Sequence, residues 1–560
     1  MKKGMSVLLT AAMAATMLAG CGDKDAETTT PPADDANTPA DDVNDTPDDT
    51  TTADAPEENT PSADYTDYSA GFPERVTIQI PVYDRSFEGW NVTDNYYTKW
   101  VQTEFGDKYN VDVKYVAINR GDEVQDYMQL IAAGNAPDII MHYDMPQAVN
   151  YDGEGAMQAI DLDELAFYAP NYYAKMGDTI AKYGTLNGET KFIFAERKAI
   201  YYNWVTLIRQ DWLDQVGLAM PTNREELVAV GEAWKEAGLG TLGESLKKNA
   251  FTMEYPFFTD SIATEEYAKY LDLNVAPFTW KPTEDYLRAL NAEYNAGIID
   301  PEFYMKEDDA AIKADFVAGK TGTYAFYINS STDVISSLLA NQPDAKVAVM
   351  DLGAGSPTGN GYYYQYPPYG MIMGINSKST DEQRAAVFMF LEWMSDSDNL
   401  MFLQNGPEGE AYNMENGLPI AVADYAGEAK RSQNNNKDYW CLVQEIIDYG
   451  DDDLTYQANL LNLAPAGYED LIKSAYDMAK AEEPYGIVTP IFTKAVASTQ
   501  EYSADLNAMW QQFYVDCVTC KPEEFDAKYA DYCQQYLDGG YQAILDEKQA
   551  LWDEGSYIAD

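Results

Sequence analysis

The stretch Leu130-Ile131-Ala132-Ala133-Gly134-Asn135-Ala136-Pro137-Asp138-Ile139 holds the end of a helix, a turn and the start of a strand. Apolar residues recur at helical spacing from Glu123 to Ala133, and Gly134 ends that periodicity. The apolar, β-branched segment 137–141 predicts a strand. A helix that leads directly into a strand is the repeating unit of an α/β sheet.

The same alternation continues on both sides of this stretch. We expect further strands at 75–82, 111–116, 204–209 and 370–375, and further helices at 283–297, 383–394, 504–515 and 525–536. Thr222 and Glu225 are spaced as a capping box, which predicts a helix start with Thr222 as N-cap. Strands separated by helices favour mostly parallel sheets flanked by helices, with ligands at the loops beyond the carboxyl ends of the strands.

The first residues have the layout of a secretory signal. Lys2 and Lys3 precede an apolar run to Leu18, which is too short to span a bilayer of roughly 30 Å. The small residues before Cys21 resemble a bacterial lipobox, so residues 1–20 are predicted as a signal peptide and Cys21 as the lipidated, palmitate-bearing N-terminus. The alternative is an ordinary secretory signal followed by a coincidental cysteine.

The segment from Cys21 to residue 73 is dominated by Asp, Thr, Pro and Ala. Such a composition cannot bury enough apolar area to offset the entropy lost on ordering. We therefore expect a disordered acidic tether that holds the folded part near the outer face of the cell membrane. Two acyl chains would anchor it, since each buried CH₂ contributes about 0.8 kcal/mol.

The strongly negative charge of the chain makes it unsuited to negatively charged partners. The formal net charge is −56 and the pI is about 4.1, which disfavours nucleic acid and strongly anionic ligands. His142 is the only histidine, so a zinc site with several histidines is excluded and a catalytic triad would depend on this residue. We expect His142 to be a hydrogen-bonded loop residue rather than a catalyst.

Four cysteines follow Cys21: Cys441, Cys517, Cys520 and Cys533. A single CxxC spacing without a matching second pair is weak support for a metal or redox site. We expect buried thiols or one or two disulfides, with the pairing left open, and we predict no metal and no cofactor.

Several stretches, in their order along the chain, resemble the extracellular solute-binding lipoproteins of bacterial ABC importers, and most closely their family-1, sugar-type members. They are residues 130–139, Asp161-Leu162, 168–171, 209–213 with Pro221-Thr222, 295–302 and 406–412. The resemblance covers most of residues 74–555. It implies two α/β lobes joined by a hinge, a monomer, and delivery of an intact ligand to the subunits of an ABC permease.

The resemblance also implies that neither lobe is continuous in sequence. We expect lobe 1 to comprise residues 74–200 and 369–425, and lobe 2 to comprise 201–368 and 426–560. Some relatives carry a calcium-binding loop in the second lobe. Residues 235–241 lack the alternating carboxylates of such a loop, so no calcium site is predicted there.

A sugar presents apolar C–H faces and a rim of hydroxyls, which call for aromatic rings together with charged or amide groups. The chain holds 44 tyrosines and 10 tryptophans, and several lie past expected strand ends. The candidate ligand-binding residues are Asp84, Arg85, Trp90, Arg120, Tyr143 and Asp144 from lobe 1, and Trp280, Tyr327, Tyr366 and Trp440 from lobe 2.

The sequence therefore predicts a non-enzymatic protein that captures a carbohydrate, in particular an oligosaccharide, between two lobes. Three alternatives remain open. They are a peptide receptor of the same fold, a surface glycoside hydrolase with two carboxylates across an aromatic cleft, and an adhesin, which the absence of repeats disfavours.

Overall fold

The computed structural model describes residues 65–87, 89–198, 203–243, 246–248, 258–259, 262–271, 275–306, 309–328, 331–359, 363–422, 424–430, 436–451, 454–458, 464–465 and 467–559. The predicted signal peptide, Cys21 and the predicted tether up to residue 64 lie outside these residues.

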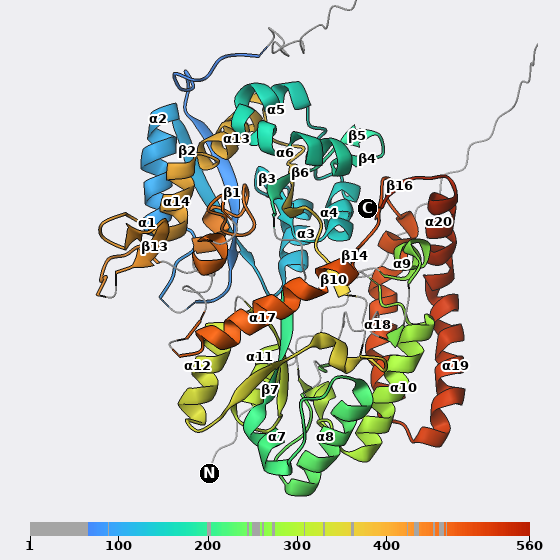
Figure 1. Ribbon diagram of the computed structural model, residues 1–560. Helices are drawn as coiled ribbons and strands as arrows, with labels where there is room; N and C mark the ends of the chain where they lie inside the picture. Colours follow the sequence, from blue (N-terminus) through green and yellow to red (C-terminus); the bar gives the residue numbers. More distant parts are fainter. Residues whose placement is uncertain are drawn as a thin grey trace, which may run out of the picture. The chain divides into compact units, whose positions relative to one another are not determined.

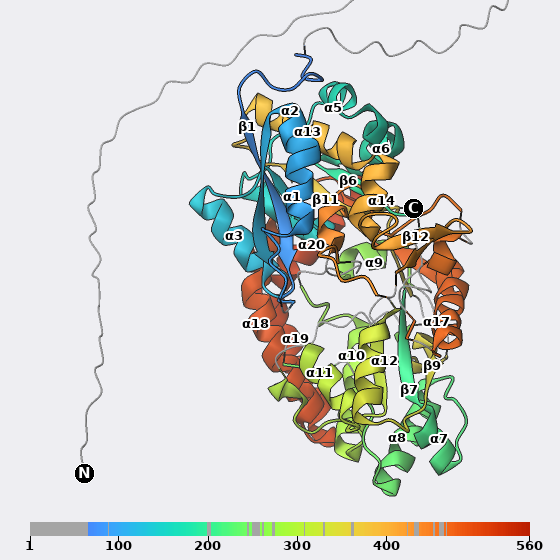
Figure 2. The ribbon, with the colours of Figure 1, turned by 90° about the vertical axis from the view of Figure 1, so that its left-hand side faces the viewer.

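A parallel pair of strands opens the described chain. β1 (Val76–Asp84) pairs with β2 (Val111–Asn119) along their whole length, with Val76 opposite Val111. In Figure 2, α3 (Glu123–Ala133) lies to one side of this pair, and α1 (Tyr96–Val101) with α2 (Asp107–Tyr109) lies to the other. A parallel connection needs a crossover of this kind, so the strand–helix–strand expectation is confirmed here.

The prediction that the sheets are mostly parallel is wrong. β11 (Tyr369–Ile375) lies between β3 (Ile139–His142) and β6 (Ile193–Glu196) and is antiparallel to both. β7 (Trp204–Arg209) lies between β8 (Thr323–Tyr327) and β9 (Val347–Met350), again antiparallel to both. Alternation along the chain does not determine strand direction. β11 comes from far along the chain to lie between β3 and β6, and even the successive strands β7 and β8 are antiparallel.

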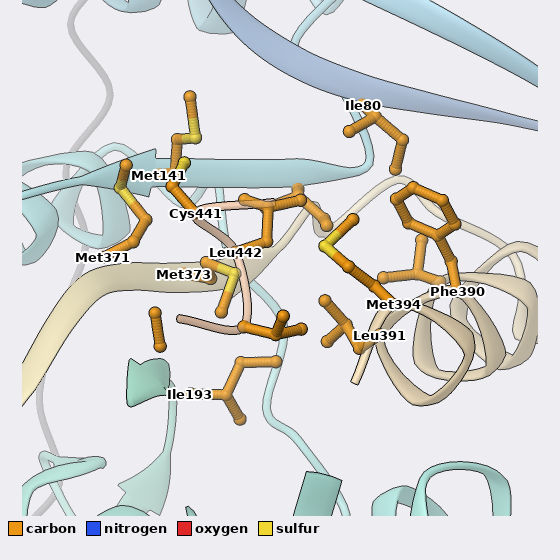
Figure 3. Packing of buried hydrophobic residues seen from close by; sticks show 14 of the residues in the cluster. Ile80, Met141, Ile193, Met371, Met373, Phe390, Leu391, Met394, Cys441 and Leu442 are labelled. Carbon is orange, nitrogen blue, oxygen red and sulfur yellow. The ribbon is translucent and has the colours of Figure 1, made fainter. Parts of the chain in front are cut away.

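A first apolar core surrounds β1, β2, β3, β6 and β11. Met371 and Met373 of β11 pack near Met141 of β3 and Ile193 of β6, and Cys441 joins them from much later in the chain (Figure 3). Residues 429, 439–443 and 447 contribute further members to this core, including Trp440 and Leu442. The expected lobe boundary at residue 425/426 would assign that segment to the other half of the molecule, whereas its packing is with the first core.

The other half contains two apolar cores. One packs α8, α10 and the C-terminal helices α18 and α19, and the other packs β7 and β8 against α12 and α17 (Figure 1). α10 and α18 contain Asn291 and Cys517, and the Asn291 amide donates to the carbonyl of Cys517 at 3.0 Å. Helices from the end of the chain thus complete this core of the second half.

The remaining elements have the following bounds. The helices are α4 (Met145–Gly153), α5 (Leu162–Tyr168), α6 (Pro170–Tyr183), α7 (Gln210–Val216), α8 (Arg224–Ala237), α9 (Thr264–Tyr270), α10 (Lys281–Ala296), α11 (Asp309–Val317), α12 (Ser331–Asn341), α13 (Asp381–Met394), α14 (Ser397–Asn405), α17 (Glu469–Glu482), α18 (Ala497–Thr519), α19 (Phe525–Tyr536) and α20 (Gln542–Asp553). The short strands are β4 (Thr185–Leu186), β5 (Glu189–Thr190), β10 (Tyr363–Gln365), β12 (Tyr412–Glu415), β13 (Leu418–Ala421), β14 (Gly486–Val488), β15 (Ile491–Phe492) and β16 (Tyr557–Ile558). Among the single helical turns, η1 (Gln102–Gly106) continues α1, and η6 (Lys437–Tyr439) is part of the candidate site.

The helix expected from Thr222 begins one residue later than predicted. Asn223 is the N-cap of α8, and its side-chain oxygen accepts from the backbone of Glu226. Thr222 instead donates its hydroxyl to the carboxylate of Glu226 at 2.8 Å. Both residues carry a capping oxygen, and the spacing alone did not distinguish them.

The segment before β1 is packed rather than free. The Tyr65 hydroxyl donates to Asp161 at 2.6 Å, the Tyr68 and Phe72 rings stack at 4.1 Å, and Phe72 is buried. The expected tether reached residue 73, but these aromatic side chains provide the apolar area that the preceding residues lack. The four described cysteines are free thiols, and Cys441, Cys517 and Cys520 are buried. Among the described residues, no helix has the length and apolar composition needed to cross a membrane.

Candidate functional site

The loops beyond β1, β2 and β3 meet at one end of the first core. The backbone N–H of Arg120, after β2, donates to the carbonyl of Asp84 at 2.9 Å. The Arg120 guanidinium lies 5.0 Å from the ring centre of Tyr83 and 5.6 Å from that of Tyr143, the residue after β3. Cation–π contacts of this length hold the three loops together.

The segment that contains η6 adds charged groups to these loops. Arg85 forms an ion pair with Asp438, and Lys437 donates to Glu445 at 2.7 Å. Lys437 also lies 5.7 Å from the ring centre of Tyr143. The side chains of Asp438 and Glu445 are only 5% and 4% exposed, so these are buried carboxylates that hold cations.

Glu445 is positioned by the end of β6. Its backbone N–H donates to the carbonyl of Glu196 at 2.8 Å, and the N–H of Glu196 donates to Val443 at 3.0 Å. The next residue, Arg197, contacts the Glu445 carboxylate at 3.4 Å and lies 4.0 Å from the ring centre of Tyr366. The Glu445 carboxylate therefore contacts two basic side chains, Lys437 and Arg197, which come from different parts of the chain.

Aromatic side chains from the second half of the molecule reach the same charges. Trp204 and Tyr327 are opposite each other in the β7–β8 pair, with ring centres 5.9 Å apart. Tyr327 interacts electrostatically with Lys437 and with Tyr366. The cluster is thus completed by rings carried on the sheet of the second half.

Burial sets the ionisation of the cluster. It raises the pKa of the Tyr143 phenol well above its ordinary value, so the hydroxyl is neutral. It also raises the pKa of Asp438, against the opposing effect of Arg85. Burial opposes the charge on Lys437, but Glu445 raises the net pKa of that ammonium. The Lys437 side chain is therefore positively charged at neutral pH.

Six of the ten predicted ligand-binding residues meet in this cluster. They are Arg85, Arg120, Tyr143, Asp144, Tyr327 and Tyr366. Asp84 and Trp90 lie at its margin, where Asp84 accepts from the backbone of Ser86 at 2.7 Å and the Trp90 ring packs edge-on against Tyr439 at 6.4 Å.

Trp280 and Trp440 do not join the cluster. Trp440 is 1% exposed within the first core, although it was expected to come from the other lobe. Trp280 is 2% exposed in the core of the second half, where its indole N–H donates to Glu266 at 2.6 Å and its ring stacks on Tyr270. Both aromatic rings are enclosed by apolar packing, which the sequence cannot distinguish from a ring that faces a ligand.

The prediction missed five residues of the cluster: Arg197, Trp204, Lys437, Asp438 and Glu445. Arg197 and Trp204 flank an expected crossing between the lobes, which is a signal that could have selected them. Lys437 and Asp438 lie three and two positions before the predicted Trp440, but charged residues in a loop are common on surfaces.

The cysteine and the histidine near the cluster are both buried. Burial raises the pKa of the Cys441 thiol well above its ordinary value, so this sulfur is not a thiolate. His142 is buried, its Nδ1 accepts from the backbone of Asp144 at 2.9 Å, and its Nε2 lies 2.9 Å from Glu123. In the described part of the chain, no three His, Cys, Asp or Glu side chains form a group that could hold a metal.

Several buried groups in and beside the cluster have spare hydrogen-bonding capacity, among them Glu445 and Tyr143. The hydroxyl oxygen of Tyr143 is buried and has no hydrogen-bond partner among the described residues. The Arg120 side chain, whose guanidinium lies 5.6 Å from the Tyr143 ring centre, is 38% exposed, so solvent reaches that side of the cluster. A buried hydroxyl without a partner costs free energy, which a ligand oxygen can recover.

A hollow of about 350 Å³ lies near the start of β3, away from this cluster, and is lined mostly by polar side chains. Asp138 in it accepts from the backbone of Gln79 at 2.6 Å and from the hydroxyl of Ser379, so both carboxylate oxygens are occupied. None of the predicted ligand-binding residues lines this hollow.

Comparison with known proteins identifies the family. The model described as "Bacterial extracellular solute-binding protein" matches residues 100–403, more than half of the chain. Lipoprotein LipO of Bacillus subtilis (strain 168) is 25% identical over 274 residues, which cover 46% of this chain and 53% of the relative. The match thus spans about half the length of this curated relative.

Solved structures share the fold over most of the chain. The alginate-binding protein AlgQ2, crystallised without calcium ion, has a TM-score of 0.58 at 18% identity, covering 87% of this chain and all of that one. An extracellular solute-binding protein of Bifidobacterium longum subsp. infantis has a TM-score of 0.60 at 16% identity, with coverages of 86% and 99%. The substrate-binding protein FusA of S. pneumoniae, in complex with kestose, has a TM-score of 0.56 at 14% identity, with coverages of 86% and 99%. The two-lobed α/β fold expected from the sequence is confirmed.

Proposed function

Because the chain belongs to the bacterial extracellular solute-binding proteins, we propose that it captures an oligosaccharide and delivers it unchanged to an ABC permease. The observation that carries this proposal is the cluster around Tyr143. Partly exposed aromatic rings adjoin buried charges there, and the Tyr143 hydroxyl has spare hydrogen-bonding capacity. Rings suit the apolar faces of a sugar, and charged groups suit its hydroxyls.

The structural neighbours support a carbohydrate ligand. One is named an alginate-binding protein and another is described in complex with kestose. In the proposed mechanism the two lobes close on the ligand, which removes water from the cluster and strengthens its polar contacts. Asp84, Arg85, Trp90, Arg120, Tyr143, Asp144, Tyr327 and Tyr366 would contact or frame the sugar.

The proposal includes a lipid anchor. Cys21 would carry the lipid after removal of residues 1–20, and the acidic segment that follows would tether the folded part to the outer face of the membrane. The relative LipO is itself named a lipoprotein. Metabolic labelling with a palmitate analogue would test the anchor, since Cys21→Ser should abolish incorporation while Cys441→Ser should not.

The binding proposal is tested by the thermal stability of the purified protein in the presence of oligosaccharides. A ligand at 100 times its Kd stabilises the folded state by about 2.7 kcal/mol, so a clear rise in Tm is expected with at least one glycan. If peptides raise the Tm and no glycan does, the peptide-receptor alternative replaces the proposal. Release of new reducing ends from the bound glycan would instead identify a hydrolase.

A further inference from the structure

We infer that the site around Tyr143 selects uncharged oligosaccharides and rejects those that carry uronate or other carboxylate groups. The inference rests on the proposed function and narrows its ligand class. It follows from the way in which the cations of the site are already paired within the protein.

Four basic side chains belong to the cluster, and each contacts a carboxylate: Arg85 contacts Asp438, Arg120 contacts Glu123, and both Arg197 and Lys437 contact Glu445. All three of these carboxylates are well buried, with side-chain exposures of 5% for Asp438, 10% for Glu123 and 4% for Glu445. Each cation therefore already has a carboxylate partner inside the protein before any ligand arrives, with Glu445 shared by Arg197 and Lys437.

An anionic ligand would have to compete for these cations. Drawing Arg85 towards a ligand carboxylate would leave Asp438 buried without its counter-charge. Drawing Lys437 away would leave Glu445 with only its longer contact to Arg197, at 3.4 Å. A buried charge that loses its partner is strongly destabilising. The network thus opposes a carboxylate ligand while its N–H groups remain suited to neutral hydroxyl oxygens.

The charge at the accessible edge acts in the same direction. Asp84 and Asp144 are partly exposed carboxylates beside the cluster, and neither contacts an Arg or Lys through an ion pair among the described residues. They can accept hydrogen bonds from sugar hydroxyls, whereas they repel a ligand carboxylate. The net charge of −56 adds a long-range repulsion of anions.

The test compares glycans that differ only at C6. β-1,4-Mannooligosaccharides and β-1,4-oligomannuronates of equal length form one such pair, and α-1,4-galactooligosaccharides and oligogalacturonates form another. Isothermal titration calorimetry on the full chain should give at least tenfold tighter binding for the neutral member of whichever pair binds. A uronate that binds as tightly as its neutral counterpart, or more tightly, overturns the inference and leaves the proposed function intact. If no glycan of any kind binds, the proposed function fails and this inference fails with it.

Two variants test the cause of the selectivity. Asp438→Asn releases Arg85 and Glu123→Gln releases Arg120, each with almost no change in side-chain shape. Each should improve the affinity for the uronate relative to the neutral glycan on the order of tenfold, the effect of one charge-assisted hydrogen bond.

Asp526→Asn is the matched control. Asp526 pairs with Arg288 at 2.6 Å, but it is 81% exposed on the surface of the second half. This variant removes the same charge and should leave the ratio of affinities unchanged. If Asp438→Asn and Glu123→Gln fold and the ratio stays at its wild-type value, the pairing argument is contradicted. If neither variant folds, the ratio of the affinities of the wild-type protein for the neutral glycan and the uronate decides whether the inference holds.

Discussion

Buried ion pairs and aromatic rings occur at two places in this protein, around Arg224 and Glu293 and around Tyr143, and the two places differ in their access to solvent. In the second half, Arg224 and Glu293 form a two-pronged pair at 2.8 Å with side chains 6% and 2% exposed. The Tyr529 hydroxyl there donates to the carbonyl of Phe278 at 2.5 Å. In the cluster around Tyr143 the charges are also paired, but Arg120 and Asp144 reach solvent and the Tyr143 hydroxyl has no partner.

The comparison separates residues that stabilise the fold from residues that await a ligand. A buried polar group whose hydrogen bonds are all made within the protein stabilises the fold and has no free donor or acceptor for a ligand. A buried polar group without a partner at an accessible edge costs stability and becomes useful only when a ligand supplies the missing oxygen. Substitutions around Arg224 and Glu293 should therefore lower the stability and leave the affinity for ligand unchanged. Substitutions around Tyr143 should lower the affinity more than the stability.

The largest effect is expected from Glu293→Gln. It leaves the Arg224 guanidinium buried without a counter-charge, so the free energy of unfolding should fall by about 3–5 kcal/mol. Urea denaturation measures the loss, while the Kd for a glycan should be unchanged in the folded fraction. The control, Glu554→Gln, breaks an ion pair with Lys494 that is about half exposed, and should cost less than about 1 kcal/mol. Equal losses in the two variants would refute the distinction.

Tyr366→Ala should reduce affinity more than stability. The ring of Tyr366 is partly exposed beside Arg197, and its apolar area would be covered by the sugar. Removing an aromatic contact of this size should weaken binding by about 1.5–3 kcal/mol, or roughly ten- to hundredfold. Titration calorimetry measures it. Trp280→Phe, in the closed core, should lower the Tm and leave the Kd unchanged, and an effect on Kd there would mean that the site has been misplaced.

Tyr143→Phe removes only the hydroxyl oxygen and so tests the contribution of that single atom. If the hydroxyl bonds to the ligand, its loss should weaken binding by about 1 kcal/mol, or roughly fivefold, with the stability of the free protein unchanged or slightly raised. Tyr529→Phe removes an oxygen that already has its partner. It should lower the free energy of unfolding by a similar amount and not affect Kd. Identical results for both variants would contradict the assignment.

The smallest effect is expected from Tyr65→Phe, at the contact between Tyr65 and Asp161. The hydrogen bond lowers the pKa of Asp161 and raises that of Tyr65 to about 12. A lowered carboxyl pKa stabilises the fold above the unfolded value of 3.8, and this stabilisation is lost as the pH falls through the folded pKa. A raised tyrosine pKa stabilises the fold below 10, and this stabilisation is lost as the pH rises towards 12.

The wild-type protein should therefore exceed Tyr65→Phe in stability by less than about 1 kcal/mol, because water screens this exposed contact. The difference should persist through neutral pH and disappear at both extremes. Denaturation at a series of pH values measures it. A difference that is constant down to pH values well below 3.8 would show that the hydroxyl acts through packing instead.

Local sequence patterns predicted the elements of the fold well, and long-range packing limited the rest. α3 and β7 have the predicted bounds because their periodicity and their terminating residues are contained within the element itself. The position of β11 between β3 and β6 depends on contacts across more than 170 residues, so alternation along the chain gave the wrong strand direction.

The site was predicted in part for the same reason. Residues directly after β1, β2 and β3, such as Arg85, Arg120 and Tyr143, could be selected because the loops beyond the carboxyl ends of the strands are a defined place in the sequence. Glu445 could not be selected, since it depends on a backbone contact with Glu196 that no local pattern encodes. Trp280 has the composition of a ligand contact, but the surrounding helices enclose it.

The most direct test of the account is a crystal structure of the protein with a bound neutral oligosaccharide. The account predicts that the sugar lies against Tyr143, Tyr327 and Tyr366, with one hydroxyl within hydrogen-bonding distance of the Tyr143 oxygen and no cation displaced from its carboxylate. A sugar bound in the hollow beside Asp138, or on any surface that leaves Tyr143 uncontacted, would contradict it.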